Sequence, residues 1–236
     1  MEAIILAAGM GTRLKEILNG KPKPLLEIKG KPLIQYSLEA LAAAGVKKAT
    51  IALGFKGEII KEYLEKWKGD IELSYVFNKS YETTGSMHSL YTALRNSKEC
   101  LVLDGDIVYD GEIINKLINS DDKSKVVLTK CCGSNDEVYV LLDSSNKITY
   151  LGKKNPGKNP FEFTGISKFS KEFMDIMFNL HKENLEQGNL DEYYEDCAYN
   201  ASKISPWYGF VDLNLAWSEI DKKEDIPRAL KSIENQ

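Results

Sequence analysis

A glycine-rich loop that carries an arginine follows the first apolar segment of the chain. Ile4–Ala7 has the pattern of a buried strand, and Gly9 and Gly11 come directly after it. Glycines allow a sharp turn there and let backbone N–H groups approach an anion closely. Arg13 can form a bidentate pair with a phosphate, and Lys23, held between two prolines, supplies a second positive charge. These residues predict a site for the phosphates of a nucleotide.

Other glycine loops fit this sequence less well. A dinucleotide-binding loop requires G-x-G-x-x-G/A, but Leu14 stands at the third glycine position. The second predicted strand, 49–53, also lacks the acidic residue that would bind a ribose. The string G-x-x-x-x-G-K-[ST] of the P-loop does not occur. A tight turn alone would explain the glycines but not Arg13 and Lys23, so we favour a nucleoside triphosphate.

The stretch 6–14, Leu-Ala-Ala-Gly-Met-Gly-Thr-Arg-Leu, with Lys-Pro-Lys-Pro-Leu at 21–25, resembles the nucleotidyltransferases that make NDP-sugars and CDP-alcohols. The family pattern runs L-A-A-G-x-G-[ST]-R-[LM] and then P-K-x-[LM]. Two later landmarks, Asp104-Gly-Asp106 and Glu219-Ile-Asp221, follow in the expected order, so the resemblance covers nearly the whole chain. It implies an α/β, Rossmann-like (GT-A-like) fold and the transfer of a nucleotidyl group. The residues expected to bind the nucleotide are Leu6, Ala7, Ala8, Gly9, Gly11, Thr12, Arg13, Ser86 and Asp104.

The resemblance assigns a metal site to two aspartates, Asp106 and Asp221. Mg²⁺ prefers carboxylate oxygens and keeps several waters, so one or two acids are enough to hold it. A turn acid at Asp106 and a helix N-cap at Asp221 are the alternatives. Nucleotidyl transfer brings two anions together, so the catalyst must screen charge and align the reactants. Lys23 is expected to bridge the α-phosphate and the acceptor, while Arg13 holds the departing phosphates.

The segment Gly85-Ser86-Met-His-Ser-Leu differs from the base-recognition loop of the sugar enzymes. It resembles the CDP-alcohol enzymes, chiefly the bacterial phosphocholine and 2-aminoethylphosphonate cytidylyltransferases. Ser86 and the nearby backbone could recognise a pyrimidine edge, so CTP is the expected nucleotide. The alternative is that Ser86 simply caps the helix that follows it.

An acidic and aromatic segment, 191–196, is expected to bind the acceptor. Aromatic faces attract a small organic cation, and carboxylates neutralise it. The acidity favours an aminoethyl group, which indicates 2-aminoethylphosphonate, with phosphocholine and a sugar 1-phosphate as alternatives. Exposure of these acids on a helix, with the tyrosines packed beneath, explains the segment equally well. The residues expected on the acceptor side are Lys154 (with Lys153 as an alternative for the phosphate), Tyr194, Glu195 and Asp196, with Trp207 and Tyr208 nearby.

Strand and helix patterns alternate up to about residue 122 and predict βαβ units with a parallel sheet. Ligands in such sheets lie at the carboxyl ends of the strands, where the three motifs of this half fall. From Lys125 onward, strand patterns predominate and predict a small antiparallel extension. The expected organisation is a nucleotide-binding half, 1–122, and an acceptor-binding half, 123–236. The predicted segments are strands at 48–53, 71–77, 99–103, 125–129, 138–142, 147–152, 164–169 and 206–211, and helices at 34–44, 57–66, 87–94, 171–187 and 222–233.

Composition limits the classes of function. The 236 residues carry a formal net charge of −4, which argues against broad binding to nucleic acid. No apolar run is long enough to cross a bilayer, and no basic leader precedes the first strand, so a cytoplasmic protein is expected. The four cysteines are expected to be reduced thiols, and two histidines are too few for a histidine-based metal centre. A homo-oligomer, a fused partner domain and a non-catalytic nucleotide sensor all stay open.

Overall fold

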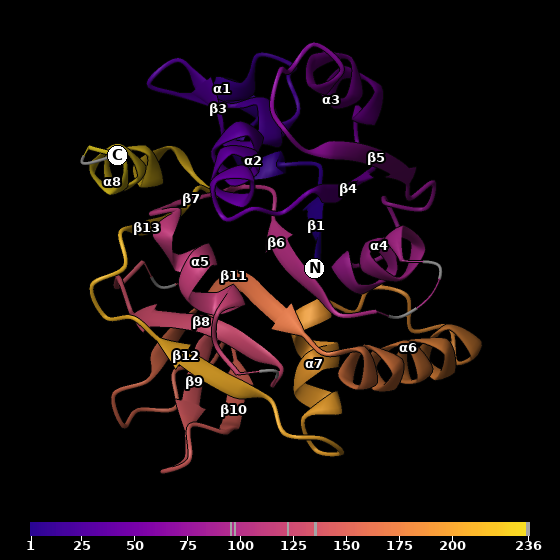
Figure 1. Cartoon of the computed structure of the whole chain (residues 1–236), viewed down its shortest axis with the longest axis vertical. Helices are drawn as coiled ribbons and strands as arrows, with labels where there is room; N and C mark the ends of the chain where they lie inside the picture. Colours follow the sequence, from indigo (N-terminus) through magenta and orange to yellow (C-terminus); the bar gives the residue numbers. More distant parts are fainter. Residues whose placement is uncertain (95, 97, 122, 135, 235–236) are drawn as a thin grey trace.

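A mixed sheet runs through the centre of the computed structural model and is covered by helices (Figure 1). The structure describes residues 1–94, 96, 98–121, 123–134 and 136–234. The strands of this sheet are β1 (Glu2–Ala7), β4 (Lys48–Leu53), β5 (Glu72–Phe77), β6 (Cys100–Asp104), β8 (Lys125–Lys130), β9 (Tyr139–Leu142), β10 (Ile148–Gly152), β11 (Phe161–Phe169) and β12 (Tyr208–Val211). They lie in the order β10–β9–β11–β6–β1–β4–β5. Outside this order, β8 pairs with both β11 and β12. Two small sheets pair β2 (Glu27–Ile28) with β3 (Lys31–Pro32), and β7 (Ile107–Tyr109) with β13 (Trp217–Glu219).

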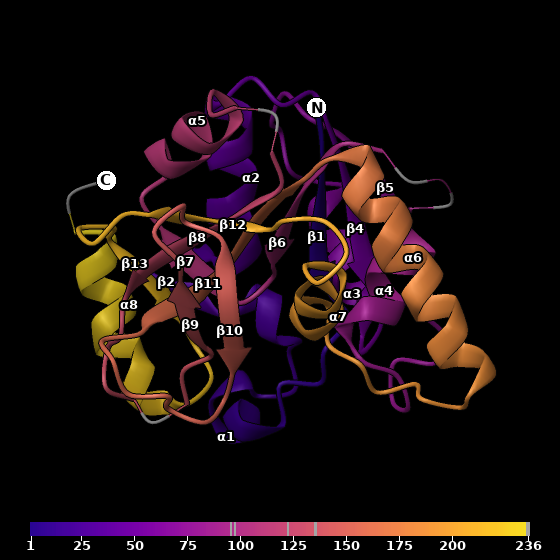
Figure 2. The same ribbon diagram turned by 90° about the horizontal axis from the view of Figure 1, so that it is seen from below.

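The helices lie on both faces of the strands. They are α1 (Lys15–Leu18), α2 (Leu33–Ala43), α3 (Gly57–Leu64), α4 (Ser86–Ala93), α5 (Glu112–Ile118), α6 (Lys171–Glu186), α7 (Tyr194–Ala201) and α8 (Ile226–Ser232). Short 3-10 turns are η1 (Thr12–Leu14), η2 (Lys23–Leu25) and η3 (Lys223–Asp225). In Figure 2, α2 and α5 lie on one side of the central strands, and α4 and α6 lie on the other. Within the described residues, the search for a helix of sufficient length and apolarity to cross a bilayer finds none.

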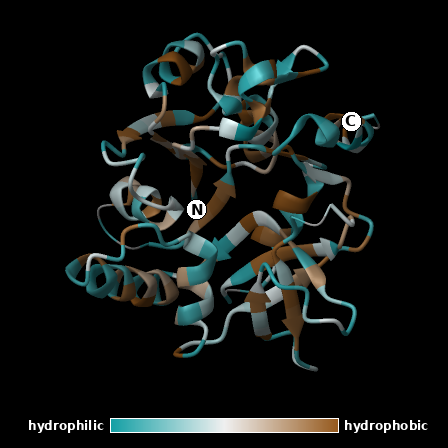
Figure 3. Cartoon of the chain, turned by 180° about the vertical axis from the view of Figure 1, so that it is seen from behind, coloured by the Kyte–Doolittle hydropathy of each residue, from teal (hydrophilic) through white to brown (hydrophobic). Residues whose placement is uncertain are grey.

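The core strands are apolar on both faces because helices cover both faces. On β1, Ile5 packs into the cluster that includes residues of α2, α3 and α5, whereas Ile4 packs into the cluster under α4, α6 and α7. Both side chains are fully buried. Figure 3 shows the hydrophobic residues concentrated on the strands and the hydrophilic ones on loops and outer helix surfaces. Because helices cover both faces of β1, the loop that follows this strand lies at the edge of the sheet formed by the carboxyl ends of the strands.

The parallel half of the predicted α/β fold is confirmed, since β6, β1, β4 and β5 all run in the same direction. The antiparallel extension is also confirmed, with β11 antiparallel to β6, β8 and β9. β11 begins at Phe161, three residues before the start that the strand pattern predicted. It joins the two predicted halves directly, because it pairs with β6. The division of the chain at residue 122 stays a prediction.

Several short elements were not predicted from the sequence. They include α5 and the pairing of β7 with β13, whose strands have only three residues each. Strands of that length show no measurable alternation, so their pairing depends on tertiary contacts. The four cysteines are free, as expected. Cys100 and Cys197 are buried among apolar residues, whereas Cys132 is exposed.

Candidate active site

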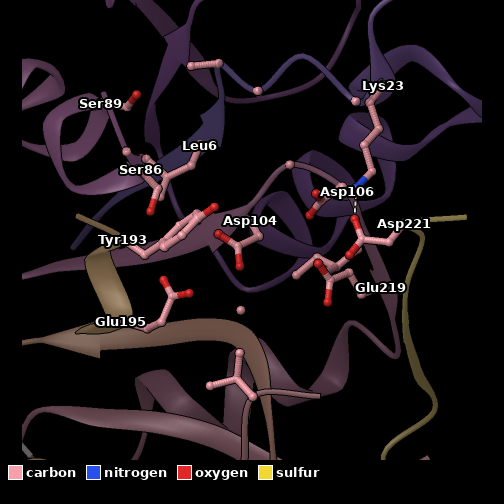
Figure 4. Close-up of a pocket in the computed structure, with 18 of the residues that line it drawn as sticks. Leu6, Lys23, Ser86, Ser89, Asp104, Asp106, Tyr193, Glu195, Glu219 and Asp221 are labelled. Atoms are coloured by element: carbon pink, nitrogen blue, oxygen red, sulfur yellow. Dashed lines mark hydrogen bonds and ion pairs between the residues drawn. The ribbon is translucent and has the colours of Figure 1, made fainter. Parts of the chain in front are cut away.

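A cavity of about 720 Å³ opens at the carboxyl ends of β1 and β6. Segments far apart in the sequence line it, including the glycine loop, the 81–86 loop, β11 and the carboxyl end of β13 (Figure 4). Every residue predicted to bind the nucleotide lies on its wall: Leu6, Ala7, Ala8, Gly9, Gly11, Thr12, Arg13, Ser86 and Asp104. Lys23, Asp106, Glu195, Asp196 and Asp221 also line it. The cavity therefore brings together the glycine loop, the two aspartates predicted to bind a metal and part of the segment predicted to bind the acceptor.

The short β7–β13 sheet brings the two metal acids together. Glu219 pairs with Ile107 in this sheet, and the backbone N–H of Ile220 donates to the carbonyl of Asp106 at 3.1 Å. The residue after Ile220 is Asp221, so its carboxylate comes to lie beside Asp106. Asp225, not Asp221, accepts the backbone N–H groups at the start of η3, at 2.9 Å each. The N-cap alternative for Asp221 is therefore wrong.

Lys23 lies between the two aspartates. Its ammonium nitrogen is 2.7 Å from Asp106 Oδ2 and 2.6 Å from Asp221 Oδ1, as the dashed lines in Figure 4 show. The side chain is only 8% exposed. Burial lowers the pKa of Lys23, but the two carboxylates outweigh burial and raise it above the ordinary value. The lysine is therefore a permanently charged group at the centre of the acid cluster.

Arg13 completes this ion-pair network. Its guanidinium lies 3.0 Å from Asp221 Oδ2 and contacts the carboxylate of Asp136. Gly11 allows the loop to approach Lys23, because its φ is +59° and a Cβ there would lie 3.0 Å from Lys23 Cβ. Both cations that the sequence singled out thus face the same acids from the glycine loop and η2.

The acid cluster fits a hard divalent cation. Ligand oxygens of Asp106, Glu219 and Asp221 all lie within 4.8 Å of one another. Asp106 Oδ1 is buried and has no hydrogen-bond partner within the described part of the chain. Burial and the two neighbouring aspartates raise the pKa of Glu219, which reflects repulsion that a cation would relieve. These oxygens suit Mg²⁺, which prefers carboxylates.

Glu219 was not assigned a role from the sequence. The signal for it was the alternation of an extended chain, in which residues two apart point to the same side. Glu219 and Asp221 stand in that relation, and the family landmark contains both. Only the β7–β13 pairing shows that the shared side faces the cavity.

Ser86 takes part in the cavity wall but does not cap its helix through its side chain. The N-cap of α4 is Gly85, and Ser86 is the first helical residue. Its hydroxyl oxygen accepts a hydrogen bond from the backbone N–H of Tyr194 at 2.9 Å. The N-cap alternative for Ser86 is therefore wrong, and the hydroxyl instead joins the nucleotide side to the acceptor side.

Several residues predicted on or near the acceptor side do not line the cavity, and Tyr194 and Trp207 are two of them. Tyr194 is 1% exposed and packs in the core, with its ring centroid 5.9 Å from that of Phe163. It begins α7, and its side chain falls on the buried face with those of Ala198 and Ala201, four and seven residues later. Tyr193, which is 59% exposed, lines the cavity instead. Trp207, expected near the acceptor, is also buried in the core.

Lys153 lines the cavity and Lys154 does not. Lys153 donates to the carbonyl of Asp136 at 2.8 Å, on the Arg13 side of the site. The carbonyl of Lys154 accepts a hydrogen bond from Tyr150 at 2.6 Å, which ties that residue to the outer turn. The two lysines are adjacent at the end of β10, where a shift of one residue reverses the direction of a side chain.

The acceptor end of the cavity is rich in carboxyl groups. Burial, reinforced by Asp106 and Glu195, raises the pKa of Asp104 well above its usual range. Burial also raises the pKa of Glu195 to about 7, with a further contribution from Asp196. Figure 4 shows Asp104, Glu195 and Tyr193 on the side of the cavity away from Lys23. A cation bound there would stabilise the ionised carboxylates.

Sequence and structure comparisons identify the family and the fold. The model of the MobA-like NTP transferase domain matches residues 3–149. The chain belongs to the MobA-like NTP transferase family. It is therefore a nucleotidyltransferase by family and has the α/β fold of that class.

The transferase resembles several proteins along most of its length. It is 28% identical to CTP:phosphoglutamine cytidylyltransferase of Campylobacter jejuni, over 96% of this chain and 98% of that protein. It is 35% identical to D-glycero-alpha-D-manno-heptose 1-phosphate guanylyltransferase of the same organism, over 91% and 95%. Identity to CMP-5'-(3-aminopropyl)phosphonate synthase of Streptomyces rubellomurinus is 25%, over 95% of this chain but only 37% of that protein.

Solved structures confirm the fold. CTP:phosphocholine cytidylyltransferase from Streptococcus pneumoniae has a TM-score of 0.83 at 24% identity and covers 98% of this chain and 97% of its own. The inositol-1-phosphate CTP transferase from T. maritima has a TM-score of 0.81 at 23% identity, with 99% and 96% covered. The shared fold extends over both the parallel core and the antiparallel extension.

Proposed function

We propose that the transferase is a Mg²⁺-dependent cytidylyltransferase that transfers CMP from CTP to a small acceptor with an amino group. The acceptor we propose first is 2-aminoethylphosphonate, and phosphocholine is the next candidate. The observation that carries the proposal is that one cavity combines two cations beside the phosphate loop with a separate group of carboxyls at the start of α7. Lys23 and Arg13 stand at the phosphate loop, and Glu195 and Asp196 stand on another part of the wall, in α7.

Charge complementarity supports an acceptor with both signs. A phosphonate or phosphate oxygen of the acceptor must approach the α-phosphorus, close to Lys23. An ammonium at the other end of a small acceptor would then lie toward Glu195 and Tyr193, where a carboxylate and an aromatic face can stabilise it. A sugar would use these carboxylates only as hydrogen-bond acceptors for its hydroxyls, whereas an ammonium would also neutralise their charge. Lys153 is the residue of the 153–154 pair that we now propose for the acceptor phosphate, because it lines the cavity.

The reaction would proceed in one displacement. An acceptor oxygen forms a bond to the α-phosphorus while the bond from that phosphorus to the bridging oxygen of the β-phosphate breaks, and pyrophosphate leaves with the electron pair. Lys23 would turn from the aspartates to the crowded α-phosphate, and Arg13 would neutralise the departing pyrophosphate. When bound by Asp106, Glu219 and Asp221, a divalent metal supplies further neutralisation of phosphate charge.

The printed names of similar proteins favour the same class of reaction. CTP appears in the names of the phosphoglutamine, phosphocholine and inositol-1-phosphate enzymes. An aminopropylphosphonate appears in the name of the Streptomyces relative. Each name belongs to that protein alone, but together they support CTP and a small phosphorylated or phosphonylated acceptor for this chain.

A sugar 1-phosphate is the third candidate acceptor, after phosphocholine. The observation that favours it is the 35% identity to the heptose 1-phosphate guanylyltransferase, the highest identity among the relatives named above. The chain is also 30% identical to the bifunctional protein GlmU of Methanococcus maripaludis, of which it spans only 53%. The nucleobase separates the sugar phosphate from the aminophosphonate as candidates, because the heptose 1-phosphate enzyme is named for guanylyl transfer and not for cytidylyl transfer.

The proposal is tested by pyrophosphate release with Mg²⁺ and a grid of substrates. CTP, UTP, GTP and ATP are each combined with 2-aminoethylphosphonate, phosphocholine, phosphoethanolamine and glucose 1-phosphate. We expect rapid release with CTP and the aminophosphonate. Release mainly with phosphocholine would move the acceptor assignment, and release mainly with GTP and the sugar phosphate would overturn the proposal. CTP binding without release from any pair would favour a nucleotide sensor.

A further inference from the structure

The two histidines of the chain meet behind the wall of the cavity, not in it. His88 lies on α4 and His181 on α6, and their nitrogens Nδ1 and Nε2 are 3.2 Å apart. His181 is completely buried. On its other side, His181 Nδ1 lies 3.5 Å from Glu192 Oε2, and the Glu192 side chain is only 10% exposed. The three side chains form a continuous polar network between two helices and the segment before α7.

The network is buried. Within the described residues, His181 Nδ1 and Glu192 Oε2 face each other at 3.5 Å without a regular hydrogen bond, and both atoms are buried. The ring of Tyr91 lies 5.3 Å from that of His181 and excludes water from one side. Burial raises the pKa of Glu192, but His181, Asn184 and Cys197 outweigh this and lower it. Glu192 is therefore a carboxylate that His181 stabilises together with Asn184 and Cys197.

One arrangement of protons satisfies the chain of atoms with both rings neutral. A proton on His181 Nδ1 faces the Glu192 carboxylate at 3.5 Å and is favoured electrostatically, which leaves His181 Nε2 as an acceptor. His88 then donates from Nδ1 to that nitrogen. The carboxylate thus determines the tautomer of His181 and, through it, the donor of His88.

Glu192 also belongs to a segment that is attached to α4 by its backbone. The N–H of Gly85 donates to the carbonyl of Leu190 at 2.8 Å, and the N–H of Met87 donates to that of Glu192 at 3.2 Å. A Cβ on Gly85 would lie 2.1 Å from the carbonyl oxygen of Glu192, so the two backbones touch. The backbone N–H of Tyr194 also donates to Ser86. Three backbone hydrogen bonds therefore form a junction between the 190–194 segment and the start of α4.

The junction separates the two substrate sides of the cavity. On one side, Gly85 and Ser86 line the wall that we assign to the nucleotide. On the other, Asp191 and Tyr193, the neighbours of Glu192, line the wall that we assign to the acceptor. Figure 2 shows α4, α6 and α7 grouped on the same side of the sheet. Displacing Glu192 would displace both of these neighbours.

We propose that His88, His181 and Glu192 are positioning residues that fix the acceptor wall of the cavity against the first turn of α4. None of the three needs to touch a substrate. Their role is to hold the 190–194 segment, and with it Asp191 and Tyr193, at a set distance from Ser86. α4 is anchored independently by Met87 and Leu90 in the core, so loss of the network moves the acceptor wall more than the nucleotide wall.

We call His88, His181 and Glu192 the clamp. Hydrogen exchange tests its positioning role without any catalytic turnover. Glu192→Gln keeps the shape of the side chain but removes its charge, and Glu186→Gln on the exposed end of α6 is the matched control. We expect the amides of Gly85, Met87 and Tyr194 to exchange about tenfold faster in Glu192→Gln, with amides of α2 unchanged. Unchanged exchange at these three amides, or equal acceleration in α2, would overturn the proposal.

Two substitutions of His181 separate the halves of the network. An asparagine amide approximates the Nδ1 side of the ring, which faces Glu192, and a glutamine amide approximates the Nε2 side, which faces His88. We expect slow exchange to be retained better in His181→Asn than in His181→Gln. The reverse order would overturn the assignment of Glu192 as the partner that holds the segment.

Steady-state kinetics give a second measurement, which also depends on the proposed function. With CTP and 2-aminoethylphosphonate, Glu192→Gln should raise the KM for the acceptor about fivefold and leave the KM for CTP unchanged. Equal rises in both KM values would contradict a selective effect on the acceptor wall. Fast exchange in a protein that turns over no acceptor would overturn the proposed function and leave the clamp standing.

Discussion

The ammonium of Lys23 lies 2.6 Å from Asp221 and 2.7 Å from Asp106, in the cluster that could hold a metal ion. One positive charge thus already compensates carboxylates that Mg²⁺ would use. The carboxylates of Asp106 and Asp221 cannot pair fully with Lys23 and with a metal ion at the same time. Phosphates that attract Lys23 would release the carboxylates to the metal, so binding of nucleotide and metal should favour each other.

Substitution Lys23→Met should therefore strengthen metal binding in the absence of nucleotide. We expect the dissociation constant for Mn²⁺, used as a spectroscopic substitute for Mg²⁺, to fall about tenfold because the competing ammonium is gone. Turnover should fall about 10²- to 10³-fold, since a group that stabilises the transition state is lost. Electron paramagnetic resonance of free Mn²⁺ measures the first effect. Lys21→Met, an exposed lysine paired with Glu27, is the control and should change neither quantity.

Asp106→Asn should separate an enzyme from a nucleotide sensor. The substitution keeps the shape of the side chain but weakens both metal binding and the contact with Lys23. We expect turnover to fall at least about 10²-fold while the thermal unfolding midpoint changes little. Calorimetric titration with CTP measures whether nucleotide binding persists. Unaltered pyrophosphate release would exclude Asp106 from the metal site.

The affinity for a cationic acceptor should depend on pH through Glu195. Burial raises the pKa of this carboxyl to about 7, so it is neutral below that pH and negative above it. An ammonium gains from the negative form alone, so the KM for the aminophosphonate should fall about tenfold as the pH rises from about 6 to about 8. The KM for the acceptor in Glu195→Gln should be flat across this range. A parallel slope in the variant would assign the titration to another group.

The same shift has a consequence for stability. A carboxyl whose pKa is raised on folding stabilises the folded state below its ordinary pKa of 4.5 and loses that contribution as pH rises through about 7. The unfolding free energy of the wild type should therefore decrease from about pH 5 to about pH 8 more steeply than that of Glu195→Gln. Urea unfolding at both pH values measures the difference.

Substitution by alanine should affect the adjacent residues Tyr193 and Tyr194 differently. Tyr193→Ala removes an exposed side chain of the cavity wall and should raise the KM for the acceptor without changing the unfolding midpoint. Tyr194→Ala removes a buried ring and should lower the unfolding free energy by about 3–5 kcal/mol. Thermal unfolding and acceptor kinetics on both variants check this pair. Loss of stability in the Tyr193 variant would contradict its place on the wall.

Lys168 is a structural lysine, 1% exposed, at the end of β11. Its ammonium donates to the carbonyls of Asp121 at 2.9 Å and Ser120 at 3.2 Å, just beyond α5. Lys168→Met leaves these carbonyls without their buried donor and should cost about 2 kcal/mol of unfolding free energy. Lys171→Met, on the exposed start of α6, should cost little. Chemical denaturation with an unchanged KM for the nucleotide would confirm a purely structural role.

The sequence was sufficient for the parts of the site that depend on local chemistry. The glycine loop, Arg13 and Lys23 form a motif whose spacing within one βα unit largely determines where its charges lie. The two aspartates followed from the family pattern, but their meeting depends on the β7–β13 pairing. That pairing joins distant segments, and no local period in the sequence reveals it.

Which side chains point into the cavity could not be predicted from the sequence at two positions. Tyr194 and Lys154 are one residue away from the residues that line the cavity, Tyr193 and Lys153. The start of α7 and the end of β10 determine which neighbour faces inward, and such boundaries are poorly marked in a sequence. The composition of the 191–196 segment predicted an acidic wall, and Glu195 and Asp196 lie on it.

A single continuous strand, β11, lines the cavity with four consecutive residues, 162–165. β11 pairs with β9 at Phe161 and with β6 at Ile166 along one edge, and Thr164 and Gly165 face the cavity between these two pairings. Because a strand advances about 3.3 Å per residue, its covalent geometry sets the length available to a bound acceptor. A fixed span favours selection by molecular length as well as by charge. Relatives that accept a longer or shorter chain are therefore expected to differ in their rim loops, on an unchanged frame.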